Sequence, residues 1–295
     1  MASYTATTSL SPVSLLGIPI DKTTLDDVAI AIDRAALTRT RLLISTVNTN
    51  FLVAGRRNEA FRASLLASDL CTVDGIGLQL AATFLGVDVG ERVTGASLLE
   101  RLRDRPVGAL GRPLRVFLFG GAEGVADRAK QRLDAVNSPA LTCVGALNPG
   151  FGSLDEMSRP EIIEAINRAR PDLIVVALGA SRGQAWLMRT ASKLDVPVCS
   201  HLGAALNYLA GSVERAPERW QRLGLEWLWR IKTEPHLVSR YAGDGVAFAW
   251  LLAMEALPSI LRRAVAPTRP SDGKVALRQR PTDTLLVLSG TLTCG

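Results

Sequence analysis

Polar side chains follow two apolar, strand-like runs within residues 42–97. Thr46 and Asn48 close the first run, and Asp74 followed by Gly75 closes the second. The carboxyl ends of parallel strands meet at one edge of a sheet, where α/β proteins bind their ligands. A carboxylate at that edge can act as a general base, which typically contributes about 10²–10⁴-fold in rate. We therefore predict the reactive site here, with a turn-forming or capping Asp74 as the ordinary alternative.

Each polar residue near Asp74 has a chemical and an ordinary interpretation. Thr46 and Asn48 can hydrogen-bond a sugar or a nucleotide, but on spacing alone capping of the next helix is favoured. Arg92 suits a diphosphate because its guanidinium donates bidentate hydrogen bonds, whereas a lone arginine before a helix is usually solvated. Gln184, in LGASRGQAWL, can contact a base or a sugar, although an exposed helix glutamine is the default interpretation.

The segment LRVFLFGGAEGVADRAKQRL predicts a strand, a glycine turn and a helix. Gly120, Gly121 and Gly124 would let backbone amides at the helix N-terminus hold a phosphate. The spacing is not G-x-G-x-x-G, and no acidic residue is well placed for a ribose, so a Rossmann-type oxidoreductase is a disfavoured alternative. The two histidines, His201 and His236, are far apart and the chain has no D-x-D, so we predict structural histidines, no metal and no cofactor.

Strand and helix patterns alternate along the chain. Besides the two runs above, a short strand or hairpin is predicted at 13–20 and strands at 114–119, 141–147, 172–178 and 196–202. Helices are predicted at 23–38, 78–86, 96–104, 123–136, 159–169 and 182–193. This alternation favours an α/β fold with a doubly wound, mostly parallel, Rossmann-like sheet.

The length and composition indicate a full α/β core with an addition at its C-terminal side. The 295 residues are 47% apolar, and four scattered cysteines lack C-x-x-C spacing, which indicates reduced thiols, three of them in the core. We expect an α/β catalytic domain over 1–209, a helical membrane-proximal appendage over 210–264 and a disordered basic tail over 265–295. The longest apolar run, Val246 to Leu257, is too short to span a bilayer, and no secretory signal is visible.

The segment RAPERWQRLGLEWLWRIKTEP has apolar and basic residues at helical spacing. The apolar face would hold Trp220, Leu223, Trp227 and Ile231, with Arg219, Arg222 and Arg230 beside it. An amphipathic helix packed on the core is the ordinary interpretation. The alternative is an interfacial helix whose tryptophans and arginines meet headgroups or a lipid-linked diphosphate.

Taken together, these segments resemble the WecG/TagA/CpsF family of bacterial glycosyltransferases, from about residue 14 to 255. The resemblance is carried in order by TVNTNFL, SDLCTVDGIGLQLAA, ERVTGASLL, RVFLFGGAEGVADRA, NPGFG, PDLIVVALGASRGQAWL, LGAALNYLAGSVERAPERW and GLEWLWRIKTEPHLVSRY. It implies an inverting, metal-independent transfer from a nucleotide-diphosphate donor, UDP-N-acetylmannosamine or a related UDP-sugar, to a polyprenyl-diphosphate-linked saccharide in cell-surface polysaccharide biosynthesis.

The resemblance also implies a role for individual positions. Asp74 matches the proposed catalytic base of the family. The substrate-binding positions are Thr46, Asn48, Arg92 and Gln184, to which we add Gly75, Gly120 and Gly121 at the strand ends. The appendage arginines expected to reach the lipid diphosphate and the membrane are Arg215, Arg219, Arg222 and Arg230.

The implied partners are the nucleotide-sugar donor, the lipid-linked acceptor and the cytoplasmic membrane surface, without nucleic acid. The protein would be cytoplasmic and peripherally attached to the inner face of the plasma membrane, while a homo-oligomer is left open. Against the family's Gly-x-Pro-x-Gln-Glu, residues 179–185 lack the proline and the acid, and Asn207 and His236 replace an aspartate and an arginine. Ala185 and Asn207 bear on donor specificity and motivate an alternative, a nucleotide-sugar-binding protein with little or no turnover.

Overall fold

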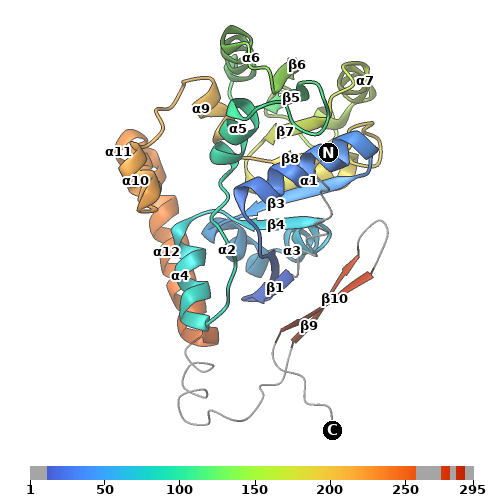
Figure 1. The fold of residues 1–295 in the computed structure, drawn as a ribbon. Coiled ribbons are helices and arrows are strands. Elements are labelled where there is room, and N and C mark those ends of the chain that lie inside the picture. Colours follow the sequence, from blue (N-terminus) through green and yellow to red (C-terminus); the bar gives the residue numbers. More distant parts are fainter. Residues whose placement is uncertain (1–11, 257–273, 280–283, 290–295) are drawn as a thin grey trace.

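A computed structural model describes residues 12–256, 274–279 and 284–289 of the chain. Its centre is a six-stranded sheet with the order β4-β3-β8-β7-β5-β6, and every neighbouring pair is parallel (Figure 1). The strands are β3 (Leu42–Val47), β4 (Leu70–Val73), β5 (Leu114–Gly120), β6 (Leu141–Leu147), β7 (Leu173–Ala177) and β8 (Val198–His201). The predicted α/β class and parallel sheet are therefore confirmed.

Helices cover both faces of the sheet, because the strands are apolar on both sides. In β5, for example, Val116 and Leu118 pack into one cluster and Phe117 and Phe119 into another. The first face carries α1 (Leu25–Thr38), α5 (Gly95–Asp104), α6 (Val125–Val136) and α9 (Ala205–Leu209). The opposite face carries α2 (Thr49–Arg57), α3 (Glu59–Leu66), α4 (Ile76–Leu85), α7 (Pro160–Arg168) and α8 (Ala180–Thr190).

An N-terminal hairpin precedes α1, as the sequence predicted for residues 13–20. Strand β1 (Pro12–Leu15) pairs antiparallel with β2 (Ile18–Asp21). The buried Asp21 at the end of β2 accepts a hydrogen bond from the backbone N–H of Cys71 at 2.7 Å, which ties the hairpin to β4. Helix α1 begins after Thr24, whose hydroxyl oxygen accepts from the backbone N–H of Asp27 in a capping box.

The helical appendage is confirmed, but its tryptophan-rich segment is not one continuous helix. It comprises α10 (Glu218–Arg222), α11 (Glu226–Thr233), the 3₁₀ turn η2 (Pro235–Leu237), α12 (Val238–Leu251) and the π-helical turn η3 (Leu252–Ala256). Gly224 separates α10 from α11 with a φ of +72°, and a Cβ there would lie 2.7 Å from Ile76 Cβ. Trp220 and Trp227 therefore belong to different helices, and the prediction of a shared face is wrong.

The appendage packs directly on the α/β domain. Helix α12 lies along α2, and Asn50 Nδ2 donates to Asp244 Oδ2 at 3.0 Å. In Figure 1 the appendage helices run beside α4 at one side of the sheet. Among the helices within the described residues, none is both long enough and apolar enough to cross a membrane.

The C-terminal tail departs from the prediction of disorder over 265–295. Strand β9 (Lys274–Gln279) pairs antiparallel with β10 (Thr284–Ser289), so part of the tail forms a two-stranded sheet (Figure 1). The remaining tail residues, including Cys294, lie outside the described residues. The other three cysteines, Cys71, Cys143 and Cys199, are buried in the core, as predicted.

Candidate active site

A cavity of about 940 Å³ lies at the carboxyl edge of the sheet, where β3, β4 and β8 end. Its volume is in the range of pockets that hold a cofactor or a nucleotide-sized ligand. The α/β domain contributes Thr46, Asn48, Asp74, Gly75, Arg92 and Gly121 to the lining. The appendage contributes Glu226, Trp227, Arg230, Arg240, Tyr241, Asp244 and Phe248. The cavity thus lies between the predicted catalytic domain and the predicted appendage.

Backbone hydrogen bonds fix the carboxylate at the edge of the sheet. The N–H of Asp74 donates to Val47 O at 2.7 Å, which holds the end of β4 against β3. Val73 forms a parallel bridge with Arg92, and the N–H of Val93 donates to Val73 O at 2.8 Å. The segment carrying Arg92 therefore runs beside β4 like a short additional strand, which places the guanidinium near Asp74.

Gly75 turns the chain from β4 into α4. Its φ of +111° is a conformation that residues with a Cβ rarely adopt, and glycine supplies it at low cost. Its nearest neighbour would be Asn48 Cβ, 4.0 Å from an added Cβ, so the backbone faces open space in the cavity. A ligand can approach the main chain closely at this point.

The half-buried Asp74 carboxyl has an unusual proton affinity. Burial raises the pKa of Asp74 to about 7, and the nearby Glu226 carboxylate adds to this rise. Arg92, a hydrogen bond from the backbone N–H of Gly95 and Arg215 oppose it. A carboxyl group whose pKa lies near neutral pH can accept a proton from a hydroxyl with a larger driving force than an ordinary aspartate. This geometry and pKa suit a general base.

Two further predicted binding residues line the cavity beside Asp74. Thr46 is buried in β3, opposite Thr72 of β4. Asn48 caps α2, and its Oδ1 accepts from the N–H of Phe51 at 3.1 Å. The capping interpretation of Asn48 is therefore confirmed, and the same side chain also lines the cavity.

Gln184 and Gly120 lie behind the cavity lining. Gln184 is fully buried on α8 and donates from Nε2 to Ser45 Oγ at 2.8 Å, so the default of an exposed helix glutamine is wrong. A Cβ at Gly120 would lie 2.7 Å from Ala177 O, which explains the glycine by packing of the turn against β7. Gly121, the next residue, does reach the cavity. Substrate contact by Gln184 or Gly120 stays a prediction.

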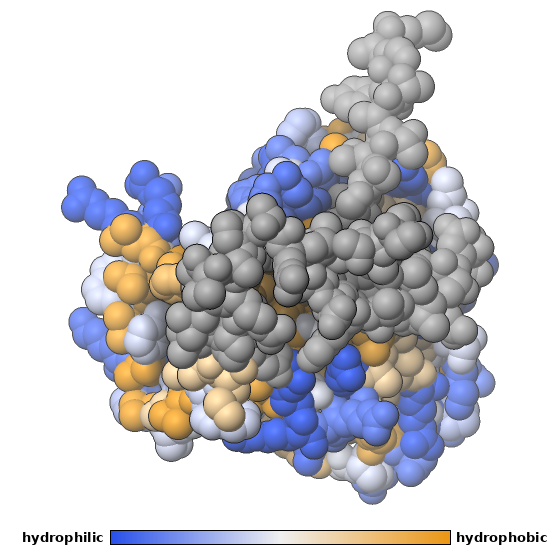
Figure 2. Space-filling model, turned by 90° about the horizontal axis from the view of Figure 1, so that it is seen from below, coloured by the Kyte–Doolittle hydropathy of each residue, from blue (hydrophilic) through white to orange (hydrophobic). Residues whose placement is uncertain are grey.

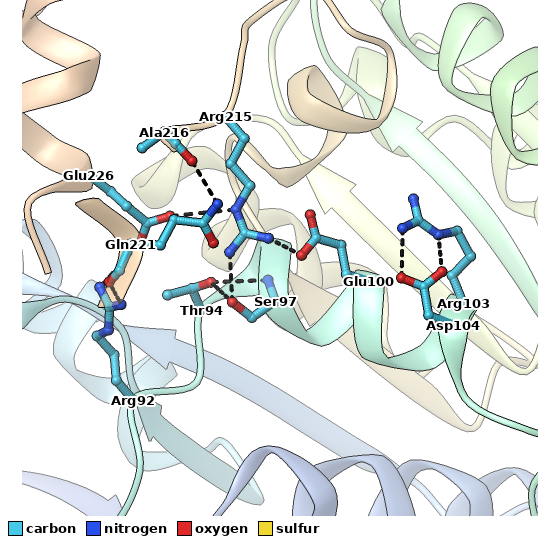
Figure 3. Close-up of polar contacts among 10 residues, drawn as sticks. All are labelled: Arg92, Thr94, Ser97, Glu100, Arg103, Asp104, Arg215, Ala216, Gln221 and Glu226. Carbon is cyan, nitrogen blue, oxygen red and sulfur yellow. Dashed lines mark hydrogen bonds and ion pairs between the residues drawn. The ribbon is translucent and has the colours of Figure 1, made fainter. Parts of the chain in front are cut away.

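An ion-pair network joins the appendage to the site (Figure 3). Arg92 Nη1 lies 3.1 Å from Glu226 Oε2, and Arg92 Nη2 donates to the backbone carbonyl of Gln221. The other oxygen of Glu226 lies 3.5 Å from Arg215 Nε. Arg215 in turn pairs with Glu100 and donates to Ser97 Oγ at 2.7 Å. The network therefore connects α11 with the segment before α5 and with α5 itself.

The structure brings two of the four predicted appendage arginines to the site. Arg215 belongs to the network above, and Arg230 lines the cavity while pairing with Glu234 at 2.8 Å. Arg219 and Arg222 are exposed on α10, away from the cavity lining, and Arg222 lies 3.6 Å from Glu218. Their predicted contact with a lipid diphosphate is therefore not made from inside this cavity.

Several cavity residues were missed by the sequence interpretation. Glu226 was not among the predicted site residues, and no local pattern shows that α11 brings it to Arg92 beside β4. His201, predicted to be structural, is buried at the end of β8 and lines the cavity, and burial lowers the pKa of its imidazole to about 4. Asn207, one of the departures from the family pattern, lines the cavity as well. Within the described ranges no three His, Cys, Asp or Glu side chains are grouped to hold a metal ion.

The fold and the site together define a class of protein. An open parallel sheet with a near-neutral carboxyl and arginines at its carboxyl edge is typical of α/β enzymes that bind an anionic substrate and move a proton. The chain matches the glycosyl transferase WecG/TagA/CpsF family over residues 13–261 and belongs to it. The protein is therefore a glycosyltransferase, and the resemblance found in the sequence is confirmed.

One similar protein carries a specific name. The N-acetylglucosaminyldiphosphoundecaprenol N-acetyl-beta-D-mannosaminyltransferase of Bacillus spizizenii is 27% identical to this chain over 192 residues. The aligned part covers 65% of this chain and 71% of the Bacillus protein. The similarity thus extends over most of both proteins.

Proposed function

We propose that this glycosyltransferase moves N-acetylmannosamine, or a closely related sugar, from its UDP donor to a polyprenyl-diphosphate-linked saccharide in cell-surface polysaccharide synthesis. The observation that carries the proposal is the Asp74 carboxyl, with a pKa of about 7, beside Arg92 in a cavity of about 940 Å³. The name of the Bacillus relative supports the choice of donor and acceptor.

Asp74 supplies the proton chemistry in this mechanism. Its carboxylate takes the proton from the acceptor hydroxyl while that oxygen forms a bond to the anomeric carbon of the donor. The bond between the anomeric carbon and the phosphate oxygen breaks at the same time, and its electron pair leaves with UDP. Attack from the face opposite the leaving group inverts the anomeric configuration.

Arginines supply the charge compensation. Arg92 approaches Asp74 from the segment beside β4 and is placed to bind the donor diphosphate, where negative charge develops as UDP departs. Arg230, which lines the cavity from the appendage side, is suited to the diphosphate of the lipid-linked acceptor. Stabilising the leaving group in this way requires no metal ion.

Replacing Asp74 by Asn tests the role of the base. Sugar transfer from UDP-N-acetylmannosamine to a polyprenyl-diphosphate-linked N-acetylglucosamine should lose about 10²–10⁴-fold in kcat, as expected for removal of a general base. The control Asp134→Asn removes an exposed carboxylate that pairs with Lys130 on α6, and it should leave kcat unchanged. Near-full activity of the Asp74 variant would remove this residue from the mechanism.

A panel of donors tests the substrate choice independently. A ligand that binds the native state raises its apparent stability, so the correct UDP-sugar should raise Tm more than UDP-glucose or a GDP-sugar. A larger shift with another nucleotide sugar would replace N-acetylmannosamine in the proposal and leave the role of Asp74 intact.

We also infer that the appendage contacts the membrane that holds the acceptor. Large apolar side chains are exposed on it and on the adjacent α4, namely Leu80, Phe84, Trp220, Leu223, Trp227, Leu228, Val238, Val246, Trp250 and Met254. Figure 2 shows hydrophobic residues gathered on the side where α4 and α12 lie, with hydrophilic residues next to them. Exposed Arg219, Arg222, Lys232 and Arg240 in the same region suit anionic headgroups.

A further inference from the structure

The Glu226 carboxylate, which lines the cavity, lies between two guanidinium groups. One of its oxygens is 3.1 Å from Arg92 Nη1 and the other is 3.5 Å from Arg215 Nε (Figure 3). The three side chains are only 13–18% exposed, so solvent screens their attraction less than at an open surface. Glu226 thus fills an anion-binding position made of two arginines.

These three residues come from separate parts of the chain. Arg92 is carried by the segment that bridges to β4, Arg215 follows α9, and Glu226 is the first residue of α11. Arg92 and Glu226 both line the cavity, and Glu226 is close enough to Asp74 to influence its pKa. The anion position therefore adjoins the catalytic cavity, with Arg92 and Glu226 in its lining and Arg215 next to Glu226.

A carboxylate and a phosphate compete for the same arginine donors. Arginine binds both through paired N–H groups in one plane, and two such guanidinium groups suit a diphosphate particularly well. In this structure Arg92 Nη1 faces Glu226 and Nη2 donates to Gln221 O. A diphosphate that bound to Arg92 in full would have to replace these internal acceptors.

We propose that Glu226 is a substrate-affinity residue whose carboxylate occupies the position of a substrate diphosphate on Arg92 and Arg215 and is displaced when that diphosphate binds. The inference rests on the proposed assignment of Arg92 to a diphosphate. Since Glu226 belongs to α11, its displacement releases one link between the appendage and the α/β domain. Without substrate, the Glu226 carboxylate keeps the two arginines in position, and the same contact weakens diphosphate binding.

Calorimetric binding of UDP and of inorganic pyrophosphate to the full chain tests this inference. Replacing Glu226 by Gln removes the competing charge and keeps the size of the side chain, so both ligands should bind about tenfold more tightly, the scale of one partly buried ion pair. The control Glu214→Gln makes the same change in net charge at an exposed residue next to Arg215, and its affinities should equal those of the unaltered protein.

A second variant keeps the test valid if the Gln substitution impairs folding. Glu226→Asp retains the charge but is one methylene shorter, so it spans the two arginines poorly and the affinities should rise less than with Gln. Unchanged or weaker binding of both ligands to the Glu226 variants, with binding to the unaltered protein intact, would overturn the inference and leave the proposed function standing. If the unaltered protein binds neither UDP nor pyrophosphate, the assignment of Arg92 fails, and the inference and the donor proposal fall with it.

Discussion

The α/β domain and the appendage contribute to one cavity but are held together by different forces. In the α/β domain, Asp74 and Arg92 are set by backbone hydrogen bonds at the end of a sheet whose strands are buried on both faces. In the appendage, α10 and α11 have no buried residue among those described. Polar contacts such as Arg92–Glu226 and Asn50–Asp244 join the appendage to the α/β domain, beside apolar packing by Phe248 and Leu252. Segments with few buried apolar contacts open at lower free energy than a core.

This difference separates two tasks of the enzyme. The general base needs a fixed position, because misplacement of a reacting group by about 1 Å can cost about 10²-fold in rate. The appendage, which supplies Glu226 and Arg230, has to admit a lipid-linked acceptor and a nucleotide sugar. A weakly packed helical segment can move to admit them. In the proposed mechanism, the rigid α/β domain thus carries the proton transfer, and the more adaptable appendage contributes to charge compensation.

Stability measurements on two tryptophans should show this contrast most strongly. Trp186 is fully buried, stacks on Phe119 with 4.3 Å between ring centroids and donates to Met157 O at 2.9 Å. Trp186→Ala should lower the free energy of unfolding by about 3–5 kcal/mol, as for other large core truncations. Trp227, 40% exposed on α11, should cost less than about 1 kcal/mol when replaced by Ala. Similar losses in urea unfolding of the two variants would refute the contrast.

The sequence predicted the α/β domain better than the appendage for the same physical reason. Strand β5, predicted at 114–119 and observed at 114–120, has an apolar run that a parallel sheet buries on both faces, so the local pattern determines the element. Asp74 was predicted as a site residue because a polar residue at the carboxyl end of such a strand lies at the edge where α/β proteins bind ligands. The six strands and the position of Asp74 at the sheet edge therefore follow from local patterns and from the topology of parallel sheets, whereas its role as the base came from the family resemblance.

Residues supplied by tertiary docking could not be predicted in this way. Glu226 lies near Asp74 only because α11 packs against the Arg92 segment beside β4, and no periodicity in the sequence encodes that contact. Gly224 was part of an apparently continuous helical pattern, yet its positive φ and its closeness to Ile76 end the helix. Similarly, Gln184 was expected at a surface, but its partner Ser45 lies in β3, 139 residues away.

Arginines on the two sides of the comparison should differ in their effect on catalysis. Arg92→Ala removes the guanidinium next to Asp74, and kcat/KM for the nucleotide sugar should fall about 10²-fold, as for loss of a group that stabilises developing charge. Arg219→Ala changes an exposed residue of α10 and should leave kcat/KM unchanged with a short-chain, soluble acceptor. Steady-state kinetics with varied donor measure both. Equal losses would mean that the appendage arginines act on the donor as well.

The pH dependence of kcat/KM should report the pKa of the Asp74 carboxyl. The proposed mechanism uses Asp74 in its ionised form. With a pKa of about 7, kcat/KM should fall about tenfold per pH unit below pH 7 and level off above it. An acid limb near pH 4, the range of an ordinary aspartate, would contradict the assignment.

The same pKa predicts the stability of the Asp74→Asn variant. The native state binds the proton more tightly than the unfolded chain, whose carboxyl keeps the ordinary value of 3.8, so this contribution to stability is lost as pH rises from about 4 to 7. At pH 8 the Asn variant should therefore be more stable than the unaltered protein by about 1 kcal/mol, a value reduced for solvent screening at a half-buried site. At pH 4 the two should unfold alike. Thermal unfolding of the Asn variant and the unaltered protein at pH 4 and at pH 8 tests this prediction.

Membrane binding should involve the appendage side and leave the chemistry intact. Phe84, 67% exposed on α4, and Trp250, 62% exposed on α12, offer apolar rings to a bilayer. Replacing both by Ser should reduce sedimentation with anionic vesicles a few-fold, because each ring adds an increment of buried apolar area, while kcat with a soluble acceptor stays the same. Added salt should weaken binding further, since the neighbouring arginines are exposed.

The pair Leu37 and Val136, exposed on α1 and α6, serves as the matched control, and Ser at these two positions should not change sedimentation. An equal loss of sedimentation from both pairs would show that the appendage side does not direct membrane binding. The two regions would then differ only in what they contribute to the cavity.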